Sequence, residues 1–180
     1  IKSSQIKKIF ITHMHGDHIY GLPGLLATLG LSGKSKGIEI YGPSELKDFI
    51  NSALRSSFCK LSFPLHFVEV ENFASENKIL FENNNLKVNC ACLKHKIPAY
   101  GYRVSEKDKP GLFDIKKAET LRIAPGPIYS ELQQGKKVSL ADGRSFDGKD
   151  FCGPPRRGES FVYCTDTVFS ESAVSLSKNA

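Results

Sequence analysis

The sequence has no apolar run long enough to cross a bilayer, which takes roughly 20 consecutive apolar residues. The longest candidate, GLPGLLATLGL (21–31), is short and is interrupted by Gly and Pro. The opening stretch IKSSQIKKIF also lacks the basic start and long apolar core of a secretory signal peptide. These absences predict that the protein has no membrane segment, and we expect a cytoplasmic location, with an organelle not excluded.

Paired cysteines are also missing. The five cysteines are an odd number, and none of them forms a Cys-X-X-Cys pair. Disulfide frameworks use even sets of cysteines, so we expect all five thiols to be reduced. The remaining composition is ordinary: 180 residues, 40% hydrophobic and 24% charged, suit one globular domain. The net charge of +6 permits an anionic partner but does not require one.

Local patterns alternate between strands and helices, which predicts an α/β (α+β) layered fold. Strands are expected over 6–12, 37–43, 65–73 and 159–166, with two more inside 78–95 around an Asn-rich turn. Helices are expected over 19–31 and 45–54, the second with Ser44 as its N-cap. The chain starts in a strand pattern and stops at the start of a helix pattern, so we expect a fold that is incomplete at both ends.

A long segment, 105–157, has no dominant period and is rich in proline. Loops of this length inside a domain are usually functional or disordered. Short helices over 113–121 and 128–135 and a hairpin over 138–146 with an Asp-Gly turn are still expected. The segment from Arg103 to Arg157 holds twelve Lys and Arg against eight Asp and Glu, which is most of the chain's net positive charge.

The stretch FITHMHGDHIYG (10–21) gathers three of the five histidines and one aspartate at the end of a strand. On such a loop His13 and His15 can share one metal ion, while Asp17 and His18 turn toward a second position. Gly16 is expected to allow that backbone turn. Imidazole and carboxylate ligands suit zinc and similar divalent ions. A polar loop would explain one histidine, but three histidines and an aspartate at this spacing favour a metal site.

Further ligands must come from other strands. His95 follows a strand whose inward face is expected to carry Leu86, Val88, Cys90 and Cys92. Asp166 follows the strand 159–166, and the carboxyl ends of strands are where ligands collect in layered α/β folds. Either residue alone could be a simple strand-end residue. His66 has no such position and is interpreted as structural.

The motif THMHGDH resembles the signature of the metallo-β-lactamase superfamily. IFITHMHGDHIYGLPGLL, IEIYGP, HKIPAYGYRV, EKDKPG, APGPIYSELQQGKKVSLADGR and YCTDT are together similar to the ribonuclease Z family over nearly the whole chain. The resemblance implies an αββα sandwich with a long inserted arm. It divides the chain into 1–104 and 158–180 of the metallo-β-lactamase domain, with 105–157 as a basic RNA-binding arm between them.

By resemblance, two Zn²⁺ ions, or other divalent metals, occupy the active site. His13, His15 and His95 would bind one ion, Asp17 and His18 the other, and Asp166 would bridge both. Asp17 would be catalytic, orienting or deprotonating the attacking water. The family has a further histidine ligand and a glutamate–histidine pair, which the resemblance places downstream of Ala180.

The implied activity is that of a metal-dependent endoribonuclease that removes the 3′ trailer from precursor tRNA, working as a homodimer. Nucleic-acid affinity comes largely from phosphate contacts, and the expected contacts on the arm are Lys107, Lys109, Lys116, Lys117, Lys136, Lys137 and Arg144. Two alternatives stay open. One is a hydrolase of the same fold that acts on a small phosphodiester or ester, and the other is an inactive RNA-binding fragment.

Overall fold

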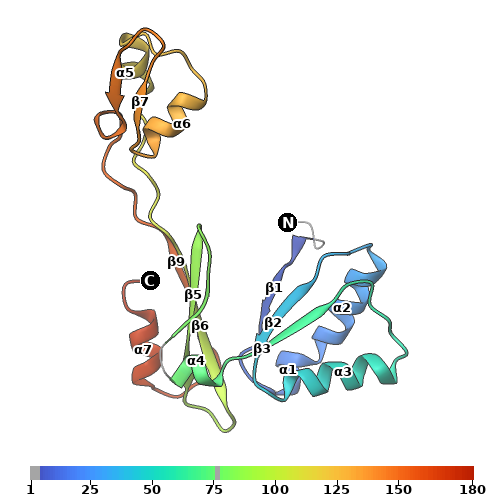
Figure 1. Ribbon diagram of the computed structural model, residues 1–180. Helices are drawn as coiled ribbons and strands as arrows, with labels where there is room; N and C mark the ends of the chain where they lie inside the picture. Colours follow the sequence, from blue (N-terminus) through green and yellow to red (C-terminus); the bar gives the residue numbers. More distant parts are fainter. Residues whose placement is uncertain (1–4, 76–77) are drawn as a thin grey trace. The chain divides into compact units, whose positions relative to one another are not determined.

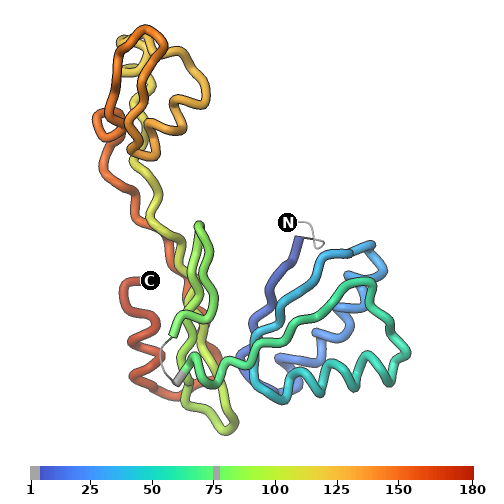
Figure 2. The backbone as a smooth tube through the Cα atoms, viewed as in Figure 1, coloured from blue at the N-terminus to red at the C-terminus, as the bar shows by residue number. Residues whose placement is uncertain are grey.

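The computed structural model describes residues 5–75 and 78–180. They form two compact units: unit 1 is Ile1–Ser105 with Ser160–Ala180, and unit 2 is Glu106–Glu159. The chain leaves unit 1 after strand β6 (Ala99–Glu106) and returns in strand β9 (Ser160–Tyr163), as Figure 2 shows. The predicted arm, 105–157, lies within two residues of the limits of unit 2, and its RNA-binding role stays a prediction.

The first sheet of unit 1 contains three parallel strands, β1 (Lys8–Phe10), β2 (Ile38–Gly42) and β3 (Leu65–Glu69), in the order β1-β2-β3. Helices α2 (Gly21–Leu31) and α3 (Leu46–Ser56) cover one face of it (Figure 1). In α3 the buried residues Leu46, Ile50 and Leu54 recur every four positions, so one stripe of the helix faces the sheet. Parallel strands need helical crossovers of this kind.

The second sheet has the order β4-β5-β6-β9 and includes β4 (Ile79–Glu82) and β5 (Leu86–Leu93). β4 pairs antiparallel with β5, and β6 pairs antiparallel with β9. Helices α4 (Glu71–Ser75) and α7 (Glu171–Ser177) contact β5. This sheet brings the strand end before His95 and the strand end before Asp166 into one layer.

The side chains of β2 alternate between the two faces of the first sheet. One face packs on the helices, and the other packs on the second sheet. Ile38 and Ile40 face the helices, whereas Tyr41 joins a second buried cluster with Val88 and Tyr102. Phe10 of β1 stacks on Tyr41 with ring centroids 4.7 Å apart. The layers therefore run helix, sheet, sheet, helix, and the predicted αββα sandwich is confirmed.

Several local predictions were wrong. Ser44 is not the N-cap of α3; Glu45 has that position, and the Ser44 amide instead donates to the Glu71 carboxylate. The predicted strand 65–73 ends at Glu69, and α4 follows it. Cys92 was expected on the inward face of its strand, together with Cys90. It is exposed, and the buried cluster on that face includes Cys90 but not Cys92. The strand β6 had not been predicted.

Unit 2 has a small core of its own made of Ala118, Ile123, Leu132, Val138 and Phe151. Around it lie helices α5 (Ile115–Thr120) and α6 (Pro127–Gln133), the hairpin β7 (Lys137–Ser139) and β8 (Ser145–Asp147), and the 3₁₀ turn η2 (Gly148–Phe151). The two helices and the hairpin were predicted. Gly143 in the Asp-Gly turn has a φ of 84°, which favours glycine.

None of the helices in the described residues has the length and apolar character that a membrane crossing requires.

Candidate metal centre and basic insertion

The histidine motif begins just past the carboxyl end of β1. The Ile11 amide donates to the Tyr41 carbonyl at 2.8 Å, which continues the pairing with β2 up to the motif. His13 follows and is fully buried. His15 precedes helix α1 (Gly16–Ile19), and the helix carries Asp17 and His18. A strand end followed by one short helical turn therefore presents all four motif side chains in six positions.

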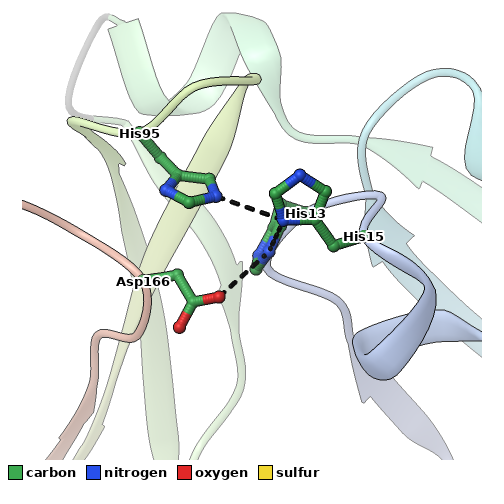
Figure 3. Close-up of side chains that lie close together, drawn as sticks. All are labelled: His13, His15, His95 and Asp166. Carbon is green, nitrogen blue, oxygen red and sulfur yellow. Dashed lines mark hydrogen bonds and ion pairs between the residues drawn. The ribbon is translucent and has the colours of Figure 1, made fainter.

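Three imidazoles and a carboxylate converge at this point, and Figure 3 shows them pointing toward one another. His15 Nδ1 lies 3.1 Å from His13 Nε2 and 3.2 Å from His95 Nε2. His13 Nε2 lies 3.5 Å from Asp166 Oδ2. The four ligand atoms all lie within 4.8 Å of one another. One small cation could contact all of them.

A second group shares Asp166 with the first. It consists of Asp17, His18 and Asp166, again with ligand atoms within 4.8 Å of one another. His18 Nε2 is 3.3 Å from Asp17 Oδ2 and 3.2 Å from Asp166 Oδ2. His66 belongs to neither group. The six residues expected to bind metal thus divide into two sets with a common carboxylate, and their role as ligands stays a prediction.

The electrostatics suit a cation. Burial, followed by the nearby imidazoles of His18, His15 and His95, lowers the pKa of His13, which favours the neutral form that binds metals. A hydrogen bond from the Thr165 hydroxyl, with smaller contributions from His18 and His13, lowers the pKa of Asp166. The donor set of imidazole nitrogens and ionised carboxylates therefore fits a divalent metal ion.

Asp166 holds an unusual backbone conformation, with a φ of 49° in the left-handed region. Such a conformation costs about 1 kcal/mol or more for a residue other than glycine, so its surroundings must hold it. Thr167 supplies part of this support. Its hydroxyl accepts from the Lys94 amide at 3.1 Å, and the Val168 amide donates to the Lys94 carbonyl at 3.0 Å. The loops that carry His95 and Asp166 are thereby joined.

Gly16 has a role other than the one expected. Its φ is not positive, so the turn does not need glycine for backbone freedom. A Cβ at this position would instead collide with the ring of Tyr20, one turn later in the chain. Tyr20 is 73% exposed, so its ring can move aside, and the glycine gives room only for the ring position seen here, beside the candidate ligands.

Sequence reasoning did not single out the Thr12 hydroxyl, which lies 3.0 Å from His13 Nδ1, or the Thr167 hydroxyl, which accepts from the Lys94 amide. Both lie directly beside a predicted ligand, in the motifs THMHGDH and YCTDT. Adjacency alone does not show which way a side chain points, so the sequence offered only this weak signal.

All seven predicted RNA contacts lie in unit 2 and are exposed. They differ in their present partners. Lys109 pairs with Glu106 at 2.7 Å, Lys137 approaches Asp147 at 4.0 Å, and Arg144 pairs with Asp142 at 2.7 Å. Lys117 donates to the Asp150 carbonyl, and Lys107 also has an interaction within the protein. Within the described residues, the ammonium groups of Lys116 and Lys136 have no hydrogen bond or ion pair.

Comparison with known proteins gives these features a family context. A family model described as Anti-Pycsar protein Apyc1 matches residues 1–108. Ribonuclease Z of Prochlorococcus marinus strain AS9601 is 91% identical over all 180 residues, and that of strain NATL2A is 60% identical over the same length. The chain spans only 58% and 57% of the length of these relatives.

Among solved structures, the short form of human tRNase Z is similar with a TM-score of 0.51 and 36% sequence identity. The match covers 59% of this chain and 47% of the human one. The resemblance drawn from the motifs is therefore confirmed. The family model described as Anti-Pycsar protein Apyc1 matches more than half of the chain, so the chain belongs to that family; it has the metallo-β-lactamase fold and is similar to ribonuclease Z along its whole length.

Proposed function

We propose that these residues form part of a zinc-dependent endoribonuclease that removes the 3′ trailer from precursor tRNA. The observation that carries the proposal is the pair of ligand groups that share Asp166, in a chain 91% identical to a protein named ribonuclease Z. A shared carboxylate between two ligand sets is suited to two neighbouring ions, as in many phosphodiester-cleaving enzymes.

In this proposal one Zn²⁺ is held by His13, His15, His95 and Asp166, and the other by Asp17, His18 and Asp166. Bound divalent ions would supply Lewis-acid activation of the phosphodiester and of the attacking water. The other divalent metals that accept nitrogen and oxygen ligands could replace zinc.

The protein residues have distinct tasks. The fully buried His13 anchors the site on the first sheet. The Asp17 side chain is 79% exposed, so its carboxylate can reach solvent, orient the attacking water and accept its proton. Attack at phosphorus with departure of the 3′ oxygen would give a tRNA with a 3′ hydroxyl and a trailer with a 5′ phosphate.

Unit 2 would bind the body of the tRNA. Its exposed Lys and Arg side chains can contact phosphates without reading sequence, and folded RNA is recognised largely by shape and backbone. The family resemblance further supports a homodimer in the cytoplasm. Unit 2 would then bind the RNA, and unit 1 would carry the metal site at which the RNA is cleaved.

The test uses the full natural protein and a precursor tRNA with a 3′ trailer. We expect the wild type to cleave at the trailer, a chelator to abolish cleavage and added Zn²⁺ to restore it. Asp17→Ala should lower kcat by about 100-fold or more. Asp48→Ala, an exposed aspartate on α3, is the matched control and should cleave normally.

Two outcomes would contradict the proposal. Cleavage by Asp17→Ala at the wild-type rate would remove Asp17 from the catalytic groups. Hydrolysis of a small chromogenic phosphodiester with no cleavage of precursor tRNA would favour a hydrolase of small substrates instead.

A further inference from the structure

The ring of His13 has contacts at both of its nitrogens. Nε2 faces the other ligand atoms, 3.1 Å from His15 Nδ1 and 3.5 Å from Asp166 Oδ2. Nδ1 faces the opposite way and lies 3.0 Å from the hydroxyl oxygen of Thr12. His13 is 0% exposed and Thr12 is 4% exposed, so water cannot easily replace this contact.

This arrangement matters for metal binding. An imidazole binds a metal through a lone pair, so with Nε2 as the ligating atom the proton must be on Nδ1. That N–H then needs an acceptor, because a buried donor without one is costly. The Thr12 hydroxyl is in position to accept it. If the ring were rotated by half a turn, Nδ1 would lose its contact with the Thr12 hydroxyl and Nε2 would no longer face the other ligand atoms.

The backbone under this pair is fixed from the second sheet. The Tyr102 hydroxyl donates to the Ile11 carbonyl at 2.6 Å, and the Tyr100 amide donates to the Thr12 carbonyl at 2.9 Å. Both tyrosines belong to β6, whereas Ile11 and Thr12 follow β1 of the first sheet. Tyr102 is 4% exposed, and burial raises the pKa of its phenol, so the hydroxyl stays a donor.

These bonds connect the two halves of the site. His13 and His15 come from the first sheet, while His95 and Asp166 follow strands of the second. Because ligands must meet within a few tenths of an ångström of their preferred distances, the spacing between the sheets sets how well they can share an ion. The Tyr102–Ile11 bond is a direct polar link across that gap, two residues from His13.

We propose that Thr12 is a positioning residue that holds His13 in its metal-binding orientation, and that Tyr102 supports it by fixing the backbone to the second sheet. The proposal rests on the metal site of the proposed function but not on its RNA substrate. Partners of this kind orient ligating histidines in other metal sites, and their loss typically weakens metal affinity by about 10- to 100-fold.

The experiment measures Zn²⁺ affinity of the full natural protein by competition with a chromophoric chelator, and the visible spectrum of the Co²⁺-loaded protein. Thr12→Val keeps the shape but removes the acceptor, and we expect affinity to fall by about 10-fold or more with a changed Co²⁺ spectrum. Thr12→Ser keeps the hydroxyl and should stay close to wild type. Thr28→Val, on α2, is the matched control and should bind normally.

Tyr102→Phe tests the backbone support, and we expect a smaller, several-fold loss of affinity. Unfolding of each metal-free variant in urea shows whether lost affinity reflects only lost folding. Wild-type affinity and spectrum in Thr12→Val would overturn the role of Thr12, as would equal losses in Thr12→Val and Thr12→Ser. Wild-type affinity in Tyr102→Phe would overturn the role of Tyr102.

The absence of precursor tRNA cleavage would contradict the proposed function alone, since these measurements contain no RNA.

Discussion

The carboxylate of Asp166 lies between two histidines of the same motif, with Oδ2 3.2 Å from His18 Nε2 and 3.5 Å from His13 Nε2. His13 belongs to one ligand group and His18 to the other. One oxygen atom therefore lies close to both groups, and it comes from the loop after β9, about 150 residues downstream of the motif.

This sharing predicts the effect of Asp166→Asn. The amide keeps the shape but removes the negative charge that two cations would share, so metal content should fall and precursor tRNA cleavage should drop by about 100-fold or more. Metal analysis and single-turnover cleavage are the measurements. Asp48→Asn should change neither, and a full metal complement in Asp166→Asn would refute the bridging role.

His95 and His66 form a natural matched pair for mutagenesis. His95 Nε2 lies 3.2 Å from His15 Nδ1, whereas His66 is on β3, outside both ligand groups. We expect His95→Ala to lose bound metal and His66→Ala to retain it, as measured by elemental analysis after gel filtration. If the two variants held equal amounts of metal, His95 would not be a ligand.

Among the described residues, the ammonium groups of Lys116 and Lys136 have no polar partner, so these two lysines are expected to contribute most to RNA affinity. Each alanine variant should raise KM for precursor tRNA several-fold and lower the slope of log affinity against log salt by about 1. Lys109→Ala should have a smaller effect because Lys109 already pairs with Glu106. Lys47→Ala on α3 is the control. Cleavage of a small phosphodiester should not change, and an equal loss on both substrates would contradict an RNA-binding role.

The ion pair between Lys8, the first residue of β1, and Glu39 predicts that stability depends on pH. The Lys8 ammonium donates to the Glu39 carboxylate at 2.5 Å and lies 3.8 Å from the centre of the Phe81 ring on β4. The hydrogen bond from Lys8, followed by one from Tyr41, lowers the pKa of Glu39. Lys8→Met should therefore lower the free energy of unfolding by about 1 kcal/mol at pH 7.

The sign follows from the lowered pKa. Stability from ionised Glu39 is fully present above the ordinary glutamate pKa and is lost as the pH falls through the lowered one. The difference between wild type and Lys8→Met in urea unfolding should therefore shrink toward acid pH. Lys7→Met, at a neighbouring exposed lysine, is the control. A difference that stayed constant with pH would show that Glu39 ionisation does not contribute.

Some features followed from local sequence because their causes are local. The motif at 13–18, the apolar repeats of α2 and α3, and the Asp-Gly hairpin of unit 2 all depend on residues within a few positions of one another. They were sufficient to predict a layered fold and the four candidate ligands of the motif, whereas His95 and Asp166 were selected by their strand-end positions together with the family resemblance. The wrong predictions at Ser44 and 70–73 also concern local signals, and at both places the structure has a tertiary contact that local patterns do not contain, the bond from the Ser44 amide to Glu71.

The sequence by itself determined which side chains could bind metal and that they follow strand ends. The tertiary structure placed one oxygen of Asp166 close to both groups, as the resemblance had implied. It alone decided that Thr12 and Tyr102 lie against His13 and the backbone before it, and which predicted RNA-contacting lysines have no polar partner among the described residues. Each of these depends on strands distant in the chain lying side by side. A residue pattern records the chemistry of a side chain, whereas its partners are set by sheet packing, which joins segments that the sequence keeps apart.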